Sequence, residues 1–303
     1  MRFLVSLCNL PQPRSTGLLL VDDSDGAIGW LDIGMPEASL LGCTGVWIGD
    51  DTVHCVATAV DGRTILSVLD RRTCEVLDIG HPDNVKDVHS VAVVDAEAYL
   101  VSTGTDEVRR LPRGNSGGPT EVVWRATPAE VDTHHLNSIL PVDGRLLCSG
   151  FGPKTGQRWS TASDGYVVDL NSGDIRWRGI QHPHSLTVGH DDLYIVESRR
   201  AQIKSLLRDD AFSVEGYARG LAAAEDGTCV AGVSRGRKVS RNLGIVENPA
   251  DDGEFTGKAA SSGSAAVMVP APERARPLVL RDGSIRCGSS LTRRQSRSEV
   301  TNQ

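Results

Sequence analysis

Four short segments decide the fold: Asp87-Val88-His89-Ser90-Val91, Asp132-Thr133-His134-His135-Leu136, His182-Pro183-His184-Ser185-Leu186 and Tyr217-Ala218-Arg219-Gly220-Leu221. They align without gaps, and their third residues are separated by 45, 50 and 35 positions along the chain. Each segment is followed by a second β-rich run ending in a serine: Ser102, Ser149, Ser198 and Ser234. A unit of several short strands that recurs about every 40–50 residues is typical of a β-propeller.

Strand signals also fill the rest of the chain. Runs rich in apolar and β-branched residues, such as 17–21 and 64–68, are separated by turn signals such as Asp61-Gly62 and Asp143-Gly144. No long stretch has the apolar spacing of an α-helix, which a two-domain α/β protein, the main alternative, would need. The sequence therefore predicts an all-β fold. We expect a six-bladed β-propeller, or alternatively a seven-bladed one, with four-stranded antiparallel blades around a central channel.

The repeats place residues 1–288 in a single propeller domain. Residues 248–276 are rich in Ala, Ser, Gly and Pro, and we expect them to form a mobile insertion around one strand, Ala265–Val269. The polar and basic residues 289–303 predict a disordered tail.

The composition narrows the possible partners. The 303 residues include 32 Lys+Arg and 39 Asp+Glu, a net charge of −7, which argues against a nucleic acid as the main partner. No apolar run reaches the roughly 18 residues of a membrane-spanning helix, and the apolar start is too short for a signal peptide. The seven cysteines are scattered without a C-x-x-C pair, which indicates reduced thiols. We therefore expect a cytoplasmic protein with a small-molecule substrate and no membrane partner; the oligomeric state stays open.

Histidines concentrate in the repeated segments. Because equivalent residues on successive blades point to one height on the propeller axis, His89, His134 and His184 are expected to meet at the channel mouth. Three neutral imidazoles with an open coordination position suit one divalent transition metal (Zn, Fe or Mn) in a catalytic site. His135 would face the other side of a regular strand, although a bulge could exchange it with His134. The register favours His134 as the ligand.

Arginines complete the predicted site. Arg219 aligns with the three histidines, while Arg199 and Arg235 follow neighbouring strand ends. We expect these side chains, with His135 beside them, to bind a carboxylate or a phosphate. The structural alternative is that arginines form a solvated basic edge.

A second layer is expected two residues before each aligned position. Asp87 and Asp132 would hold the outer nitrogens of the histidine rings, and His182 or Tyr217 would transfer a proton. The structural alternative is that the aspartates cap turns and the histidines brace neighbouring blades.

Two resemblances to known families support this interpretation. Residues 182–188, followed by 191–197, resemble the P-H-G-I-x-x-x…D-G-x-L-W-x-T-E pattern of streptogramin-lyase-like propellers, with Ser185 and Tyr194 in place of the Gly and the Trp. That resemblance implies metal-assisted elimination with a histidine base. Most of the chain is similar to an uncharacterised bacterial propeller family, with a start like residues 3–9, an H-P-H-S segment and an R-G-L…S-R-x-R segment. Amidating lyases, which bind zinc through three histidines from different blades, provide an architectural analogy.

The leading hypothesis is a metal-dependent enzyme that acts on a small anionic metabolite at the channel mouth. Lyase or isomerase chemistry fits best, because it needs only a Lewis acid and a base. One alternative is a non-catalytic propeller that binds a ligand or a protein partner. Others are a metal-dependent oxidoreductase and a lactonase-like hydrolase, for which Asn137 and Asp87 would contribute to a calcium cage.

Overall fold

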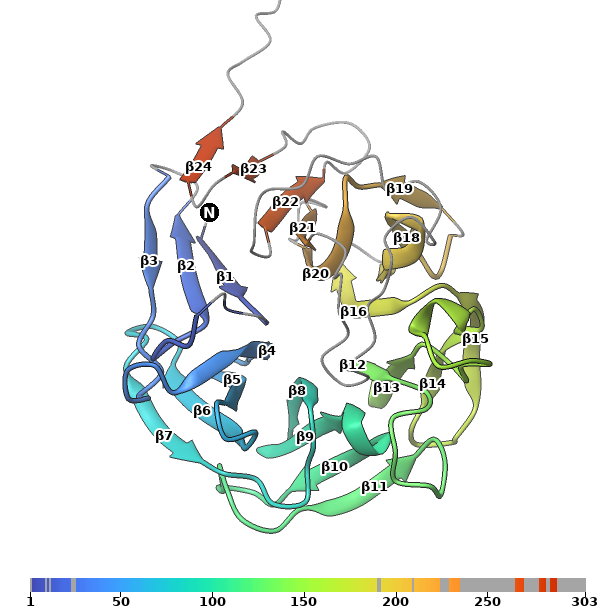
Figure 1. Cartoon of the computed structure of the whole chain (residues 1–303), viewed down its shortest axis with the longest axis horizontal. Coiled ribbons are helices and arrows are strands. Elements are labelled where there is room, and N and C mark those ends of the chain that lie inside the picture. Colours follow the sequence, from blue (N-terminus) through green and yellow to red (C-terminus); the bar gives the residue numbers. More distant parts are fainter. Residues whose placement is uncertain are drawn as a thin grey trace, which may run out of the picture.

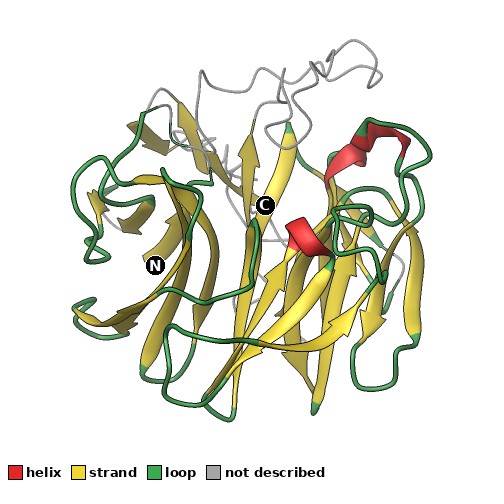
Figure 2. Ribbon diagram, turned by 60° about the horizontal axis from the view of Figure 1, so that its bottom comes forward, coloured by secondary structure: helices red, strands yellow, loops and turns green. Residues whose placement is uncertain are grey.

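Antiparallel sheets form a ring around a central axis in the computed structural model (Figure 1). The structure describes residues 2–8, 10, 12–22, 26–189, 192–208, 210–223 and 229–234, and the backbone of three later strands. In this part of the chain the helical segments are three 3-10 turns, Thr103–Thr105, Trp159–Thr161 and Ser198–Arg200. Each follows the second strand of its sheet, so that they share one face of the ring (Figure 2). None of the described helical segments has the length and hydropathy needed to cross a bilayer.

The sheets follow one another along the chain. The first contains β1 (Arg2–Ser6), β2 (Leu18–Asp22) and β3 (Ile28–Trp30). The second contains β4 (Leu40–Ile48), β5 (Thr52–Ala59), β6 (Thr64–Asp70) and β7 (Val76–Gly80). The third contains β8 (Val88–Val94), β9 (Glu97–Ser102), β10 (Glu107–Leu111) and β11 (Glu121–Arg125).

The remaining sheets repeat this order. The fourth contains β12 (Leu136–Val142), β13 (Arg145–Gly150), β14 (Gly165–Asp169) and β15 (Ile175–Ile180). The fifth contains β16 (Pro183–Gly189), β17 (Asp192–Glu197), β18 (Gln202–Ser205) and β19 (Ala211–Ser213). The last contains β20 (Tyr217–Ala223), β21 (Cys229–Ser234), β22 (Ala265–Val269), β23 (Leu278–Arg281) and β24 (Ser284–Cys287). β22 coincides with the strand expected within residues 248–276, whose other residues, like the predicted tail, lie outside the described part.

The antiparallel four-stranded blade is confirmed. The predicted number of blades is not, because the described residues do not form six or seven sheets of four strands. Five sheets reach four strands, and the first has only three. Its β2 and β3 pair Leu19 with Trp30, just as β14 and β15 pair Val167 with Trp177. β1 to β3 therefore correspond to the second, third and fourth strands of a blade. Within the described chain, the first sheet has no counterpart of the innermost strand.

The hydrophobic core lies between neighbouring sheets. Val101 and Val108 of the third sheet pack against Leu136 and Cys148 of the fourth, and all four side chains are buried. Burying a side chain such as valine or leucine contributes about 1.5–3 kcal/mol. These contacts fix successive sheets relative to one another.

The innermost strands approach each other closely at one position near the start of each strand. The hydroxyl of Ser138 accepts a backbone N–H from β16 at 3.1 Å, and the hydroxyl of Ser185 donates to the carbonyl of Arg219 at 2.7 Å. At the equivalent Gly45 of β4, a Cβ atom would lie 2.8 Å from the Cα of Ser90. Only a small residue fits at this position, which is why serine and glycine recur there.

Candidate functional site

The site is built where the innermost strands begin. β8, β12 and β16 each follow a residue in the left-handed conformation, with φ of +50° at Asp87, +50° at His135 and +53° at His182. All three strands also have a register shift within their first residues. Such bulges change the direction of side chains at strand ends, often beside functional sites. The starts of β8 and β12 place His89 and His135 side by side.

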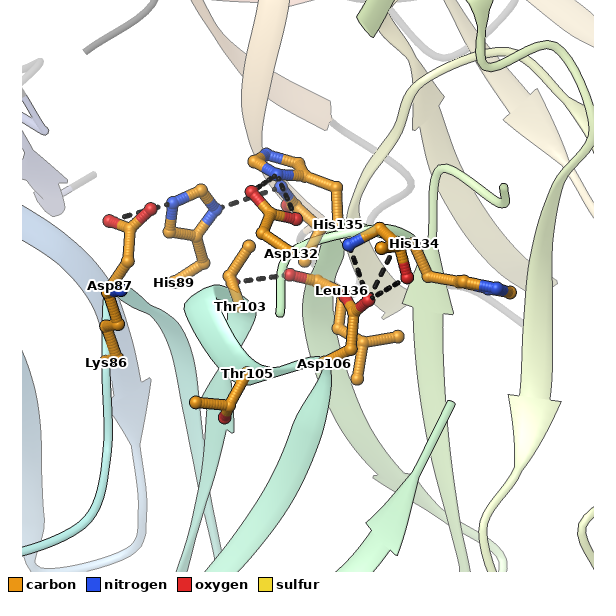
Figure 3. Close-up of polar contacts among 12 residues, drawn as sticks. Lys86, Asp87, His89, Thr103, Thr105, Asp106, Asp132, His134, His135 and Leu136 are labelled. Carbon is orange, nitrogen blue, oxygen red and sulfur yellow. Dashed lines mark hydrogen bonds and ion pairs between the residues drawn. The ribbon is translucent and has the colours of Figure 1, made fainter. Parts of the chain in front are cut away.

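His135, rather than His134, is the residue that the structure brings next to His89. Their ring centroids are 5.0 Å apart in an edge-to-face arrangement. The ring of His134 points the other way, as Figure 3 shows, and its Nδ1 lies 3.0 Å from the hydroxyl of Tyr166. The prediction that the ring of His134 faces His89 is therefore wrong. The physical reason is that β12 begins at Leu136, so that His135 takes the turn position equivalent to Asp87.

Each ring of the His89–His135 pair contacts an aspartate, although His135 was not among the histidines that the aspartates were expected to hold. A carboxylate oxygen of Asp132 lies 3.1 Å from Nδ1 of His135, and one of Asp87 lies 3.5 Å from Nε2 of His89 (Figure 3). The amide of Asn137 contacts the other nitrogen of His89, Nδ1, at 3.2 Å. Both nitrogens of His89 are therefore engaged by neighbouring side chains.

The partner of His135 fixes the position of its proton. A carboxylate can only accept a hydrogen bond, so Nδ1 carries the proton and Nε2 has the lone pair. No partner for this Nε2 lies among the described residues. Burial lowers the pKa of His135, while the hydrogen bond to Asp132 raises it by less. His135 is thus a neutral imidazole at pH 7, with its basic nitrogen available.

His182 has partners on both ring nitrogens. Nε2 donates to the carbonyl of Trp159 at 2.9 Å, so Nδ1 accepts from the hydroxyl of Tyr217 at 3.0 Å. The ring of Phe151 stacks on it, with centroids 4.5 Å apart and planes inclined by 3°. Burial lowers the pKa of His182 to about 4, with a smaller contribution from the charge of Arg199.

His184 is buried and faces a cation. Nδ1 lies 3.0 Å from the carbonyl of His182 and 2.7 Å from the hydroxyl of Ser198, which itself donates to the carbonyl of Ala218. Nδ1 therefore carries the proton. Nε2 accepts from the guanidinium of Arg219 at 3.4 Å. Burial first, and then the charge of Arg219, hold the pKa of His184 well below its usual value.

Solved structures match this backbone, whereas no protein-family model and no curated protein sequence does. A putative oxidoreductase (glucose dehydrogenase) of Thermus thermophilus is 15% identical, with 89% of this chain and 99% of that chain covered and a TM-score of 0.54. A putative 6-phosphogluconolactonase of Bacteroides fragilis is 13% identical, with 92% and 87% covered and a TM-score of 0.54. The structural neighbours are β-propellers. This chain is a β-propeller. At such identities the likeness shows the fold alone.

The predicted arginines have different places in the propeller. The guanidinium carbon of Arg219 lies 4.7 Å from the ring centroid of Tyr217, an arrangement suited to cation–π attraction. Arg199 donates to the carbonyl of Ser160, in the 3-10 turn that carries Trp159. No carboxylate pairs with Arg219 or Arg199 in the part of the chain that the structure describes. Arg235 lies outside the described residues.

Residues that the sequence did not single out complete the site. The ring centroids of Phe151 and Trp159 lie 4.5 and 4.6 Å from that of His135. The ring centroid of Phe151 also lies 5.1 Å from that of His184. They come from the end of β13 and the turn after it, a connection that carries no recognisable signal in the sequence. Asn137 was expected only in the calcium cage of the lactonase-like alternative. Its place beside His89 could have been found, because His135-Leu136-Asn137-Ser138-Ile139 repeats the order of turn residue, apolar residue, polar residue, serine and apolar residue of residues 87–91.

The residues of the predicted metal site do not fit a metal ion in this arrangement. His134 is turned away, and no three His, Cys, Asp or Glu side chains in the described residues form a group that could hold one. A set with His135 in its place would include Nε2 of His184, which faces the guanidinium of Arg219. It would also include His89, whose nitrogens already have partners.

Proposed function

We propose that this propeller is an acid–base enzyme that acts on a small anionic molecule at the mouth of its channel. The observation that supports this most is the Asp132–His135 pair beside His89. A carboxylate on Nδ1 and a lone pair on Nε2 are the arrangement in which a histidine accepts a proton from a bound molecule.

The surrounding residues suit this role. The carboxylate of Asp132 keeps His135 in the required tautomer and stabilises the imidazolium that forms when it accepts a proton. Arg219, which has no carboxylate partner among the described residues, is the candidate for binding the anionic group of the substrate. A positioned base contributes roughly 10²–10⁴-fold to a rate.

Removal of a proton from carbon, leading to elimination or isomerisation, is the reaction we favour. The base and the anion-binding arginine suffice for it when the proton lies next to a carboxylate or carbonyl. The second candidate is hydrolysis of a lactone, with His135 activating water, since one structural neighbour is a putative 6-phosphogluconolactonase. In the third, non-catalytic case the same residues only bind the anion.

Proton exchange in heavy water distinguishes these reactions across many candidate substrates at once. The full chain is incubated in D₂O with a panel of small hydroxy acids, keto acids and phosphorylated sugar lactones, and proton NMR follows each compound. We expect deuterium at carbon in at least one acid and a loss of roughly 100-fold in His135→Ala. His81→Ala, outside the site, is the matched control and should keep full activity. Hydrolysis without exchange at carbon indicates the lactonase alternative, and binding by calorimetry without turnover indicates the non-catalytic one.

A further inference from the structure

Asp106 is fully buried, yet none of the chemistry above uses it. It ends the 3-10 turn Thr103–Thr105 after β9, in the left-handed conformation with φ of +52°. Its Oδ2 accepts three hydrogen bonds from the neighbouring blade: from the backbone N–H of Thr133 at 2.7 Å, from the hydroxyl of Thr133 at 2.8 Å and from the N–H of His134 at 2.8 Å (Figure 3).

These bonds hold the segment that carries the candidate base. Asp132 directly precedes the two bonded residues, and His135 directly follows them. The same 3-10 turn makes a second contact, because the hydroxyl of Thr103 donates to the carbonyl of Leu136 at 2.5 Å. One turn of the preceding blade thus fixes the chain on both sides of His135 (Figure 3).

The chemistry of Asp106 indicates positioning rather than packing. No cation forms an ion pair with it in the described part of the chain. Its Oδ2 is held by hydrogen bonds from two successive peptide groups and a hydroxyl, while the buried Oδ1 has no hydrogen-bond partner among the described residues, so the whole polar interaction of this carboxylate is directed at residues 133–134. Fixing these peptide groups fixes the backbone direction at His134 and His135, and with it which ring turns toward His89.

We propose that Asp106 is a positioning residue that selects His135, and not His134, as the imidazole facing His89. The selection is a property of the fold. Its effect on turnover, however, rests on the proposed function. The two can fail separately: inactivity of wild type would defeat the proposed function and leave the placement of the rings to be measured on its own.

NMR of the full chain labelled in its histidines tests this placement. The readout is the nuclear Overhauser contact between the rings of His89 and His135, together with the Nδ1–H signal of His135, which Asp132→Asn and His135→Ala assign. We expect Asp106→Ala to lose both signals while the protein stays folded by near-ultraviolet circular dichroism. Asp106→Asn, whose amide oxygen can still accept from the two backbone N–H groups, should restore them in part.

A matched control separates positioning from general destabilisation. Asp169→Ala removes another buried carboxylate. Asp169 lies at the end of β14, and its Oδ2 forms an ion pair with the guanidinium of Arg176 at 3.1 Å. It should lower the free energy of unfolding but keep the contact between His89 and His135. Should Asp106→Ala fail to fold, Asp106→Ser serves instead, because its side chain is too short to reach the two amides. Full retention of both signals in a folded Asp106→Ala or Asp106→Ser protein would overturn the proposal.

Discussion

Nη1 of Arg219 lies 3.4 Å from Nε2 of His184, so a permanent cation faces a histidine that is only 3% exposed. The contact avoids a clash of charges because Nδ1 of His184 carries its proton, bonded to the carbonyl of His182. Nε2 can then accept from the guanidinium. The pair consists of a cation, Arg219, and a neutral base, His184. It therefore places one positive charge, that of the guanidinium, next to the candidate site, and the imidazole adds no other.

Removing that cation should raise the pKa of His184. In Arg219→Met, the second of the two main causes that lower this pKa disappears, while burial, the first, remains. We therefore expect a pKa that rises but stays below the usual 6.5, measured by NMR titration of the histidine ring protons. Arg199→Met is the control. The charge of Arg199 lowers the pKa of His182, so this variant should raise the pKa of His182 and leave that of His184 unchanged. A His184 pKa that stays constant or falls in Arg219→Met would contradict the arrangement.

The propeller should lose stability as the pH falls from about 7 to about 4. Burial is the main cause that lowers the pKa values of His135, His182 and His184, so the unfolded chain binds more protons than the folded one in this window. Their contribution is complete above the unfolded pKa of about 6.5 and decreases as pH falls toward the folded values. For His182, a folded pKa of about 4 corresponds to about 3 kcal/mol.

Urea unfolding at pH values of about 7.5, 5.5 and 4.5 measures this effect. The lowered pKa values of Asp61, Asp70 and Asp169 affect stability only as pH falls below about 4, so they do not confuse the result. His182→Gln should show a weaker dependence on pH than wild type. A free energy of unfolding that is constant or increases on acidification would refute the prediction.

The β-propeller fold could be predicted because every repeat has the same pattern of residues, and this pattern follows from two packing requirements. An apolar residue must face the neighbouring sheet, and a serine or glycine must stand where innermost strands touch, as Ser138, Ser185 and Gly45 do. The number of complete blades could not be predicted, because the first sheet begins with β1, which corresponds to the second strand of a blade and not to the innermost one. Nothing in residues 2–6 distinguishes such a strand from an innermost one.

The site was only partly predictable, and His134 shows why. Aligning on Asp132 matches an aspartate and a histidine to Asp87 and His89, but it puts His135 where the other segments have a serine or glycine. Aligning on His135 satisfies the small residue as well, through Ser138. The close approach of the innermost strands therefore decides the register, and the structure shows why the serine position outweighs the match of the aspartate and the histidine. Phe151 was beyond prediction, because it reaches the histidines from another strand end.

The close approach at Gly45 can be tested by adding one methyl group. In Gly45→Ala the new Cβ would lie 2.8 Å from the Cα of Ser90, and a backbone atom cannot move away cheaply. We expect the free energy of unfolding to fall by about 1–3 kcal/mol, the usual cost of overpacking. Gly29→Ala is the control, because nothing lies within 4 Å of the added Cβ there. Equal stability of the two variants would show that the innermost strands are not in contact at this point.

Metal analysis tests the alternative of a histidine-bound ion. A transition metal at His89, His135 and His184 would have to displace Arg219 from Nε2 of His184, and a divalent ion beside a guanidinium is electrostatically unfavourable. We expect elemental analysis of the purified protein to show the same metal content in wild type and in His89→Ala/His184→Ala. We also expect added Zn²⁺ to bind wild type no more tightly than it binds Arg219→Met. About one equivalent of metal in wild type that is lost in the double variant would instead establish the metal site and would require Arg219 to move away from His184.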